Sequence, residues 1–263
     1  MNRMVAMQEI EVVGVVKAQP LSLSRQGKSR IKRHLRQVGW RFAWLLFFQR
    51  VVQGLGYALS LLMPARARRL LPAWKIARAG NIAVYQTTDI NAEDAIDFVR
   101  QCQPDLLVSA YFSQILKADI LQIARFGVLN IHPGWLPAYR GAMAYFWVLH
   151  NGSDRAGVSV HWIDEGIDSG EILERRSFPI PDNATQETVL MLTAVIGTRL
   201  LRRVMRRLQS GQPARKVSTE PELSQGDYYP MPGDREFASY FEQHRFFRIR
   251  DVLGLIAFRG MRR

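Results

Sequence analysis

The chain has 263 residues, 48% of them apolar, which favours one substantial globular core with at most a small appendage. Its single cysteine excludes a disulfide framework, and the sequence has no CxxC pair or spaced His/Cys cluster that would indicate a metal site. The formal charge of +13 is local, because residues 12–88 contain fourteen Lys and Arg and no Asp or Glu. The chain begins without the apolar core of a signal peptide, so we expect a cytoplasmic protein.

The first part of the chain is predicted to hold one strand and then a long insert. Residues 1–8 are typical of the end of a helix, and residues 10–16 form a β-branched run that favours a buried parallel strand. The insert covers about residues 20–78, where a basic stretch precedes a strongly aromatic and apolar one. Its longest uncharged run, 51–65, is shorter than the roughly 18–20 residues needed to span a bilayer.

Three interpretations of the insert differ in what it contacts. A helix lying on an anionic membrane surface fits the basic flanks around Trp40, Trp44 and Tyr57. A helical hairpin packed on the sheet, with its Arg side chains in solvent, explains the same pattern without a partner. Nucleic acid or phosphate binding is disfavoured, because RNA-binding segments are expected to be polar, Gly-rich and basic rather than rich in Leu and Phe. We therefore expect a membrane-associated chain and keep the hairpin as the alternative.

The part after the insert is typical of a regular α/β unit. Residues 82–85 form a short strand, and Asn91 is predicted to cap a helix with Asp94 at the third position. Cys102 belongs to the apolar stripe of that helix and is expected in the core. A proline ends the helix, and residues 105–110 form the next buried strand.

The central stretch predicts an amide, an imidazole and a carboxylate near strand ends. Residues 128–131 are typical of the end of a buried strand, and the Pro and Gly residues that follow forbid regular structure. Asn130 and His132, two apart on an extended chain, share one side at the carboxyl end, where ligands bind in open α/β sheets. Residues 158–163 form another strand, and its Gly/Asp-rich loop delivers Asp168.

These three side chains favour direct group transfer between two bound substrates. Asn130 offers an N–H donor for a developing oxyanion, and His132 can exchange a proton near neutrality or stabilise the oxyanion as imidazolium. Asp168 can orient the imidazole, raise its pKa and relay a proton through water. A covalent acyl-enzyme is disfavoured, because G-x-S-x-G is absent and Cys102 lies away from the motif. Each residue alone is explained equally well by a buried, satisfied His or a capping Asn or Asp, but the three together favour a site.

The last part of the chain is predicted to be mostly helical. Residues 141–151 form a helix, residues 171–180 a strand, and a long helix runs from Asn183 or Thr185 to Gln209. Four arginines near its end are assigned no role beyond the helix dipole. They are Arg202, Arg203, Arg206 and Arg207. A short helix is expected to begin at Asp234, and an apolar helix at about 249–258 ends the chain.

The spaced motifs of the central stretch resemble the core of the 10-formyltetrahydrofolate-dependent formyltransferases. The chain reads N-x-H-P-x-x-L-P-x-x-R-G from Asn130, G-V-x-x-H from Gly157 and D-x-G-x-I-L from Asp168. The family includes glycinamide ribonucleotide transformylase, methionyl-tRNA formyltransferase and the amino-sugar N-formyltransferases. The resemblance covers about residues 81–210, half of the chain, and is specific because several spaced elements agree in order.

The resemblance implies the fold and the domain organisation. We expect an α/β, Rossmann-like and mostly parallel sheet with helices on both faces. The formyltransferase-like domain would cover residues 1–217, including the helical basic insert, and residues 218–263 would form a short helical extension. In the family another strand precedes the one predicted at 10–16, and there is no room for it here. We therefore expect an interior gap, an exposed edge, or another element in that place.

The resemblance also implies roles for individual residues. The expected catalytic residues are Asn130, His132 and Asp168. The expected pterin-side residues are Tyr111, Ser113, Ile115 and Leu116, together with the loop carboxylates Asp164 and Glu165. The alternative for these two carboxylates is that they are simply solvated. The expected supporting or acceptor-side residues are Arg140, His161 and Trp135. Gly134 and Trp135 stand where the family usually has Ser and Leu, which affects the shape of the acceptor pocket. No metal is expected.

The expected function is transfer of a formyl group from 10-formyltetrahydrofolate to a primary amine. The acceptor would be a small molecule, an amino sugar or a lipid-linked amine. A methionyl-tRNA acceptor is disfavoured, because fewer than fifty residues follow Val217 and their pattern is helical, which leaves no room for the barrel domain of those enzymes. The alternative is a catalytically degenerate binding protein at a membrane surface. The oligomeric state is open.

Overall fold

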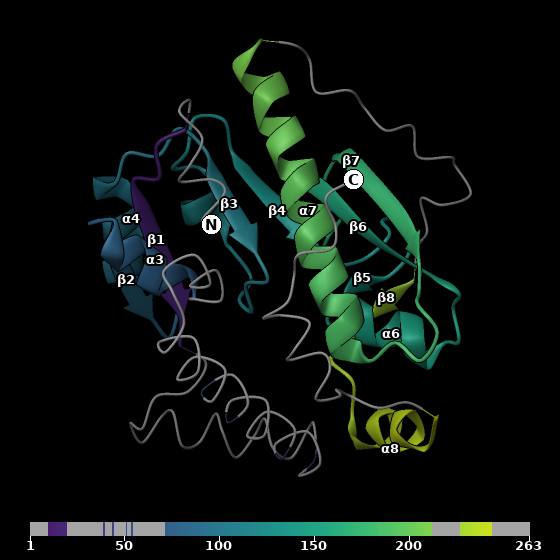
Figure 1. Cartoon of the computed structure of the whole chain (residues 1–263). Helices are drawn as coiled ribbons and strands as arrows, with labels where there is room; N and C mark the ends of the chain where they lie inside the picture. Colours follow the sequence, from purple (N-terminus) through teal and green to yellow (C-terminus); the bar gives the residue numbers. More distant parts are fainter. Residues whose placement is uncertain are drawn as a thin grey trace.

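A computed structural model describes residues 10–19, 72–211 and 227–243, and the single residues 39, 44, 51 and 54. The helices predicted at 1–8 and 249–258, and most of the insert, lie outside the described residues. Strands and helices alternate in an α/β fold, so the predicted fold class is confirmed (Figure 1). No helix in the described ranges is long and apolar enough to cross a membrane.

Two parallel strands and one helix form the first part of the fold. They are β1 (Gly14–Ala18), α3 (Ala73–Ala79) and β2 (Ala83–Thr87). The predicted bounds of the first strand, 10–16, are wrong. Gly14 pairs with Ala83 and the ladder continues past Lys17, whereas residues 10–13 precede the paired register. The helix α3 packs against both strands.

The helix α4 (Glu93–Gln101) follows β2, and its start differs from the prediction. Its N-cap is Ala92, which makes no side-chain capping bond. Asn91 Nδ2 instead donates to the Ile115 carbonyl at 2.9 Å, and Asn91 Oδ1 accepts from the Lys117 N–H at 2.8 Å. The amide therefore ties two loops together rather than capping the helix.

The second sheet has four strands in the order β3-β4-β6-β7. These strands, with the short helix after β3, are β3 (Leu107–Ala110), α5 (Ala118–Leu121), β4 (Val128–His132), β6 (Arg155–Trp162) and β7 (Ile172–Pro179). β3 and β4 are parallel, whereas β6 and β7 run antiparallel to their neighbours. Within the described ranges β1 bonds to β2 and β3 bonds to β4, so the ladder is interrupted between β1 and β3.

The long helix α7 (Gln186–Gln209) lies across β4, β6 and β7 (Figure 1). Thr185 is its N-cap, which confirms one of the two predicted starts. The Thr185 hydroxyl accepts from the Thr188 N–H at 3.1 Å, and the Thr188 hydroxyl accepts from the Thr185 N–H at 3.2 Å. Gly197 permits close packing on the sheet, because a Cβ there would lie 2.5 Å from Ile131 Cγ2.

Two arginines of α7 do more than complement the helix dipole. Arg203 Nε and Arg207 Nη1 each lie 3.1 Å from a carboxylate oxygen of Glu174 on β7. The Glu174 side chain is 13% exposed, so its charge needs partners within the protein. The prediction that these arginines serve only the dipole is therefore wrong for this pair.

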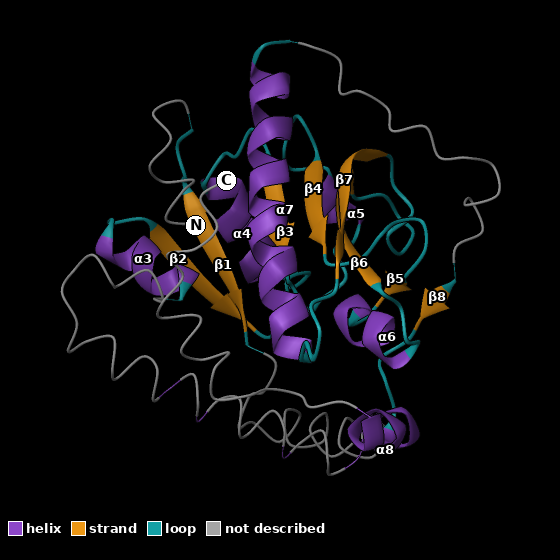
Figure 2. Ribbon diagram, turned by 45° about the vertical axis from the view of Figure 1, so that its right-hand side comes forward, coloured by secondary structure: helices purple, strands orange, loops and turns teal. Residues whose placement is uncertain are grey.

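Four short elements bring the last described residues against the domain, because β8 pairs with β5 and α8 packs on α6. They are β5 (Arg140–Gly141), α6 (Ala144–His150), β8 (Tyr228–Tyr229) and α8 (Asp234–Gln243). The helix predicted at 141–151 starts later, because β5 pairs with β8. α8 begins at Asp234 as predicted and lies beside α6 (Figure 2). Phe237 and Tyr240 pack on Phe146 in one buried cluster, so the described part of the extension belongs to the core.

Candidate active site

Asn130 and His132 lie near the carboxyl end of β4, in the middle of the second sheet. In the ladder between β4 and β6, Asn130 pairs directly with His161. Side chains at directly paired positions of neighbouring strands share a face of the sheet. This face therefore carries an amide and two imidazoles, and the register between the two strands puts them together.

Asp168 reaches the same face from the loop between β6 and β7. Its backbone is left-handed, with φ +51, which turns the carboxylate back toward the sheet. Asp168 Oδ2 accepts from the Gly141 N–H at 2.9 Å. Arg140 Nε donates to the Ile167 carbonyl at 3.1 Å. The loop is thus fixed from both sides, and Arg140 holds the loop, one of the two roles considered for it.

Asp168 is the centre of the cluster, because both of its oxygens have partners. Oδ2 lies 3.3 Å from His132 Nδ1, and Oδ1 lies 3.5 Å from His161 Nε2 and 3.4 Å from Asn130 Nδ2. The side chains of His132 and Asp168 are 4% and 13% exposed, so the ring and the carboxylate meet largely out of water. The structure brings the three predicted catalytic residues together and adds His161 to them.

Hydrogen bonds to backbone carbonyls decide which ring nitrogens carry hydrogen, because a carbonyl only accepts. His132 Nε2 donates to the Tyr139 carbonyl at 2.8 Å, and His161 Nδ1 donates to the Trp162 carbonyl at 2.7 Å. A neutral His132 therefore directs the lone pair of Nδ1 at Asp168. A neutral His161 likewise presents the lone pair of Nε2 to the centre of the site.

Asn130 has both amide hydrogens engaged in this arrangement. One is donated to His161 Nε2 at 3.1 Å, and the other to Asp168 Oδ1 at 3.4 Å. The bond to Asp168 is long and therefore weak, so it is the one that a substrate oxygen can replace at small cost. The amide of Asn130 therefore lies within the cluster, and its bond to His161 orients it.

Burial and charge act in opposite directions on His132 and Asp168. Burial lowers the pKa of His132 below its ordinary 6.5, and the Asp168 carboxylate and the Tyr139 carbonyl offset this only in part. Burial raises the pKa of Asp168, but the interactions of the carboxylate with His161, His132 and the Gly141 N–H outweigh burial and hold that pKa below its ordinary value. The His132 ring is the more deeply buried partner, so we take the neutral imidazole beside an ionised carboxylate as the state at neutral pH. In this state the pair can accept one proton, between His132 Nδ1 and the Asp168 carboxylate.

The loop after β4 is packed tightly against His132. A Cβ at Gly134 would lie 2.6 Å from His132 Nε2 and 2.8 Å from Ala144 Cβ, so the glycine is required by this packing. Ser159 Oγ donates to the Gly134 carbonyl at 2.8 Å and accepts from the Leu136 N–H at 3.0 Å. Sequence reasoning missed Ser159, although it lies two residues before His161 on β6 and therefore shares its face.

The predicted pterin-side residues lie on the loop after β3, and their side chains differ in environment. The backbone of Tyr111 has a left-handed conformation, with φ +53. Its hydroxyl lies 2.9 Å from Thr193 Oγ1 on α7. Burial raises the pKa of Tyr111 well above its ordinary value, so the hydroxyl is neutral. Ser113 and Ile115 are exposed, whereas Leu116 packs against the buried cluster that includes Ile96 and Val99 of α4. The loop thus presents a neutral, mostly apolar surface.

The other predicted residues have the following surroundings. Trp135 packs over Gly157, where a Cβ would lie 2.7 Å from the Trp135 Cβ, and the Arg175 guanidinium lies 4.3 Å from the indole centroid. Asp164 Oδ1 accepts from Ser169 Oγ at 2.7 Å, so it shapes the loop that carries Asp168. Glu165 is exposed.

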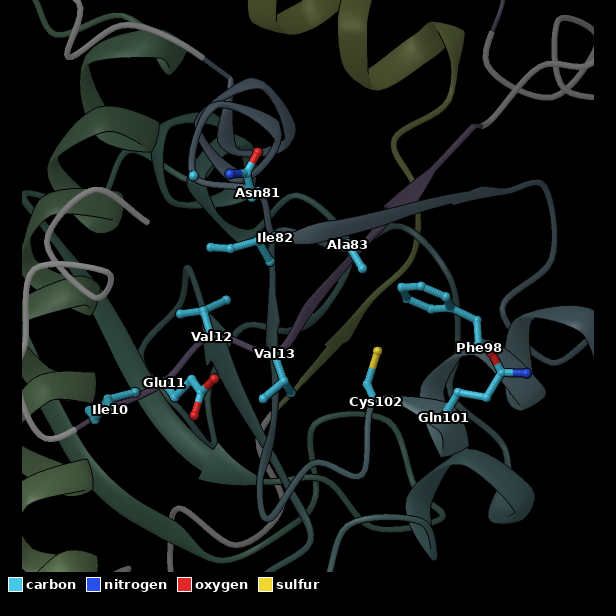
Figure 3. A pocket seen from close by; sticks show the side chains of 11 residues that line it. Ile10, Glu11, Val12, Val13, Asn81, Ile82, Ala83, Phe98, Gln101 and Cys102 are labelled. Carbon is cyan, nitrogen blue, oxygen red and sulfur yellow. The ribbon is translucent and has the colours of Figure 1, made fainter.

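A separate pocket of about 960 Å³ lies at the amino ends of β1 and β2 (Figure 3). Its walls combine apolar side chains such as Val12, Ile82 and Phe98 with polar ones such as Glu11 and Gln101. β1 and β4 point the same way in Figure 1, so this pocket is at the opposite strand ends from His132. Among the described residues, no group of three or more His, Cys, Asp or Glu side chains is placed to hold a metal ion.

Comparisons with known proteins bear on this geometry. The formyl transferase family model matches residues 62–205, a little over half of the chain. The methionyl-tRNA formyltransferase of Clostridioides difficile (strain 630) is 33% identical over 153 residues, which is 58% of this chain and 50% of that protein. The enzyme of the same name from Syntrophus aciditrophicus (strain SB) is 34% identical over 168 residues, 63% of this chain and 53% of that protein. The chain spans about half the length of the curated relatives it matches.

A solved structure is similar over more of its own length. The formyltransferase PseJ from Anoxybacillus kamchatkensis, in complex with UDP-4,6-dideoxy-4-formamido-L-AltNAc and tetrahydrofolate, superposes with a TM-score of 0.51 at 20% identity. The match covers 71% of this chain and 95% of that one, and at this identity it speaks for the fold. The match to the family model shows more than the fold, since it covers the strands and loops that carry Asn130, His132 and Asp168. The chain is a member of the formyl transferase family.

Proposed function

We propose that this protein transfers a formyl group from 10-formyltetrahydrofolate to a primary amine of a small-molecule, amino-sugar or lipid-linked acceptor, in the cytoplasm. The observation that carries the proposal is the convergence of Asn130, His132 and Asp168 at strand ends, with one proton-accepting position between Nδ1 and the carboxylate. Family membership supplies the reaction class, and the neutral loop at Tyr111 supplies an apolar wall for a pterin ring.

The reaction needs three things from the chain. The neutral amine attacks the formyl carbon, a C–N bond forms, and the carbonyl oxygen becomes an oxyanion. Asn130 donates to that oxyanion when its long bond to Asp168 gives way. The ammonium proton passes, directly or through water, to His132 Nδ1, where Asp168 stabilises the imidazolium. The C–N bond to the folate nitrogen then breaks, and that nitrogen takes up the proton.

Amino sugars are the acceptor class we favour. The structural match to PseJ covers 95% of the PseJ chain, and PseJ is crystallised with a formamido sugar nucleotide and tetrahydrofolate. The described residues after α7 form β8 and α8, and α8 packs into the domain itself. The curated relatives act on methionyl-tRNA by name, so that acceptor is the first alternative. A lipid-linked amine reached from a membrane surface is the second.

The test separates folate binding from transfer. Calorimetry with a non-hydrolysable 5-deaza formyl-folate mimic is expected to show saturable binding to the wild type and to Asp168→Asn. A folded sample that fails to bind the mimic would favour the degenerate binding protein. Transfer is then measured with 10-formyltetrahydrofolate and three acceptors: an amino-sugar nucleotide, a phosphorylated small amine and methionyl-tRNA. Turnover of methionyl-tRNA alone would overturn the acceptor we favour.

A further inference from the structure

The short strand β8 holds the end of the loop that follows β4. It pairs with β5 in parallel, and Gly141 lies opposite Tyr229 (Figure 2). The Arg140 N–H donates to the Asp227 carbonyl at 3.2 Å. The Ala142 N–H donates to the Tyr229 carbonyl at 2.9 Å. A Cβ at Gly141 would collide with the same Tyr229 carbonyl, so the two segments approach each other as closely as only glycine permits.

The Tyr229 side chain fixes the same loop from within the domain. Its ring stacks on that of Tyr139, with the centroids 5.1 Å apart and 15° between the planes. The ring centroid of Trp147 on α6 lies 5.1 Å from that of Tyr229. The Tyr229 hydroxyl accepts from Asn151 Nδ2 at 3.1 Å, and the Tyr139 hydroxyl lies 2.7 Å from Ser153 Oγ. Both tyrosines are thus anchored to α6 and to the residues directly after it.

The loop needs such contacts because its backbone conformation is unfavourable. Tyr139, Gly141 and Met143 have φ values of +57, +98 and +53. The left-handed region is disfavoured for tyrosine and methionine, so the surroundings have to hold these residues in it. The ladder with β8 and the stack of Tyr229 on Tyr139 supply contacts of this kind.

The held residues carry the two backbone groups that contact the expected catalytic side chains. The Tyr139 carbonyl accepts from His132 Nε2 at 2.8 Å. The Gly141 N–H donates to Asp168 Oδ2 at 2.9 Å. A shift of this short stretch would therefore move the hydrogen-bond partner of the imidazole and that of the carboxylate together.

The position of the Tyr139 carbonyl also decides which nitrogen of His132 carries hydrogen. The neutral ring has a single N–H and two acceptors beside it. The Tyr139 carbonyl lies 2.8 Å from Nε2, whereas Asp168 Oδ2 lies 3.3 Å from Nδ1. The shorter bond keeps the hydrogen on Nε2 and leaves Nδ1 able to accept a proton. If the carbonyl moved away, the carboxylate would draw the hydrogen to Nδ1 and fill the proton-accepting position.

We propose that β8 positions the active site and that Tyr229 is its positioning residue. Through Tyr139 the strand keeps the ring hydrogen of His132 on Nε2, and through Gly141 it holds the carboxylate in place. The match to the family model ends at residue 205, so this role falls to a part of the chain that the model does not cover. The inference rests on the proposed function, but the ring hydrogen is observable without any substrate.

The first experiment is nitrogen NMR of the full chain labelled with ¹⁵N-histidine, at about pH 8 where the ring is neutral. The signals of His132 are those missing from His132→Gln. Wild type is expected to carry hydrogen on Nε2, and Tyr229→Ala is expected to show a larger share of Nδ1–H. Tyr229→Phe keeps the stacked ring and is expected to give the wild-type pattern. An unchanged tautomer in folded Tyr229→Ala would overturn the proposal.

The second experiment measures formyl transfer by the same variants at a temperature where all are folded. Tyr229→Ala is expected to lower kcat about tenfold and to change the KM for 10-formyltetrahydrofolate less than about twofold. Tyr229→Phe should stay within about threefold of the wild type, since it loses one hydrogen bond to Asn151. Wild type that transfers no formyl group would overturn the proposed function, whereas the NMR result would still test β8.

Phe178→Ala is the matched control for general stability. Phe178 is a buried aromatic residue of β7, in the cluster against which Tyr139 and Tyr229 pack. Its loss is expected to lower the free energy of unfolding and to leave kcat within about twofold of the wild type. An equal fall of kcat in Phe178→Ala and Tyr229→Ala would mean that stability alone is measured, and would contradict the positioning role.

A double-variant cycle tests the route from Tyr229 to the site. If Tyr229 acts through the stack, Tyr139→Ala should lower kcat by a similar factor, and the double variant should lose little more than either single one. Losses that multiply would show that the two rings act independently, and would overturn the route through Tyr139.

Discussion

The buried cluster at Asp168 and the three cations around Trp74, which are Lys17, Lys75 and Arg78, hold their charge in different surroundings. Around Asp168 both carboxylate oxygens and all four ring nitrogens of His132 and His161 have a partner within 3.5 Å, because these side chains are largely buried. Around Trp74 the three cationic groups lie within 5.3 Å of one ring centroid, at positions that are half-buried or exposed. Burial thus makes partners within the protein necessary in the first cluster, whereas the cations of the second keep contact with water.

The largest expected effect is at the centre of the buried cluster. Asp168→Asn removes the charge that stabilises a protonated His132, so formyl transfer is expected to fall at least about 100-fold. The measurement is the rate of 10-formyltetrahydrofolate consumption with the best acceptor. Saturable binding of the 5-deaza formyl-folate mimic is the control and should be retained. A variant that retains full transfer would remove Asp168 from the mechanism.

A methyl group added beside His132 tests how tightly the buried cluster is packed. Gly134→Ala puts a Cβ within 2.6 Å of His132 Nε2, so it is expected to lower the free energy of unfolding by about 1–3 kcal/mol. Urea denaturation measures the change. Gly54→Ala is the matched control, since a Cβ at this helical position meets nothing within 4 Å and should be neutral or slightly stabilising. Equal stability of both variants would contradict the close packing.

The pH dependence of stability follows from the direction of the His132 shift. Its folded pKa lies below the ordinary 6.5, so the folded state binds a proton less readily than the unfolded one. The contribution of His132 is therefore fully present above about pH 6.5 and is lost as the pH falls through the folded pKa. The thermal unfolding temperature of the wild type should fall as the pH falls through this range. In His132→Gln the unfolding temperature should depend less on pH there. A steeper curve in the variant would reverse the assignment.

The smallest expected effect is at Lys17, which is half-buried beside Trp74. Lys17→Gln alone is expected to change the free energy of unfolding by no more than about 0.5 kcal/mol, because the residue is in contact with water and its neighbours repel it. Urea denaturation at low salt measures it. A loss of several kcal/mol would show that Lys17 is part of the folded core, and the contrast between the two clusters would then disappear.

Prediction from the sequence worked where one local rule was sufficient. The strand at residues 128–131, the long helix starting at Thr185 and the helix starting at Asp234 each follow from apolar periodicity or a capping residue. Asn130 and His132 share a face because alternate residues of a strand always do. It failed at Asn91, where a capping residue was expected and the amide instead joins two loops.

The sequence alone determined which groups the candidate active site contains and that they lie near strand ends. It could not determine that Asn130 pairs with His161, that Ser159 holds the loop at Gly134, or that Arg203 and Arg207 meet Glu174. Those contacts depend on the register between β4 and β6 and on the position at which α7 packs on the second sheet. Register and packing join residues far apart in the chain, and the local pattern of neither partner contains that information.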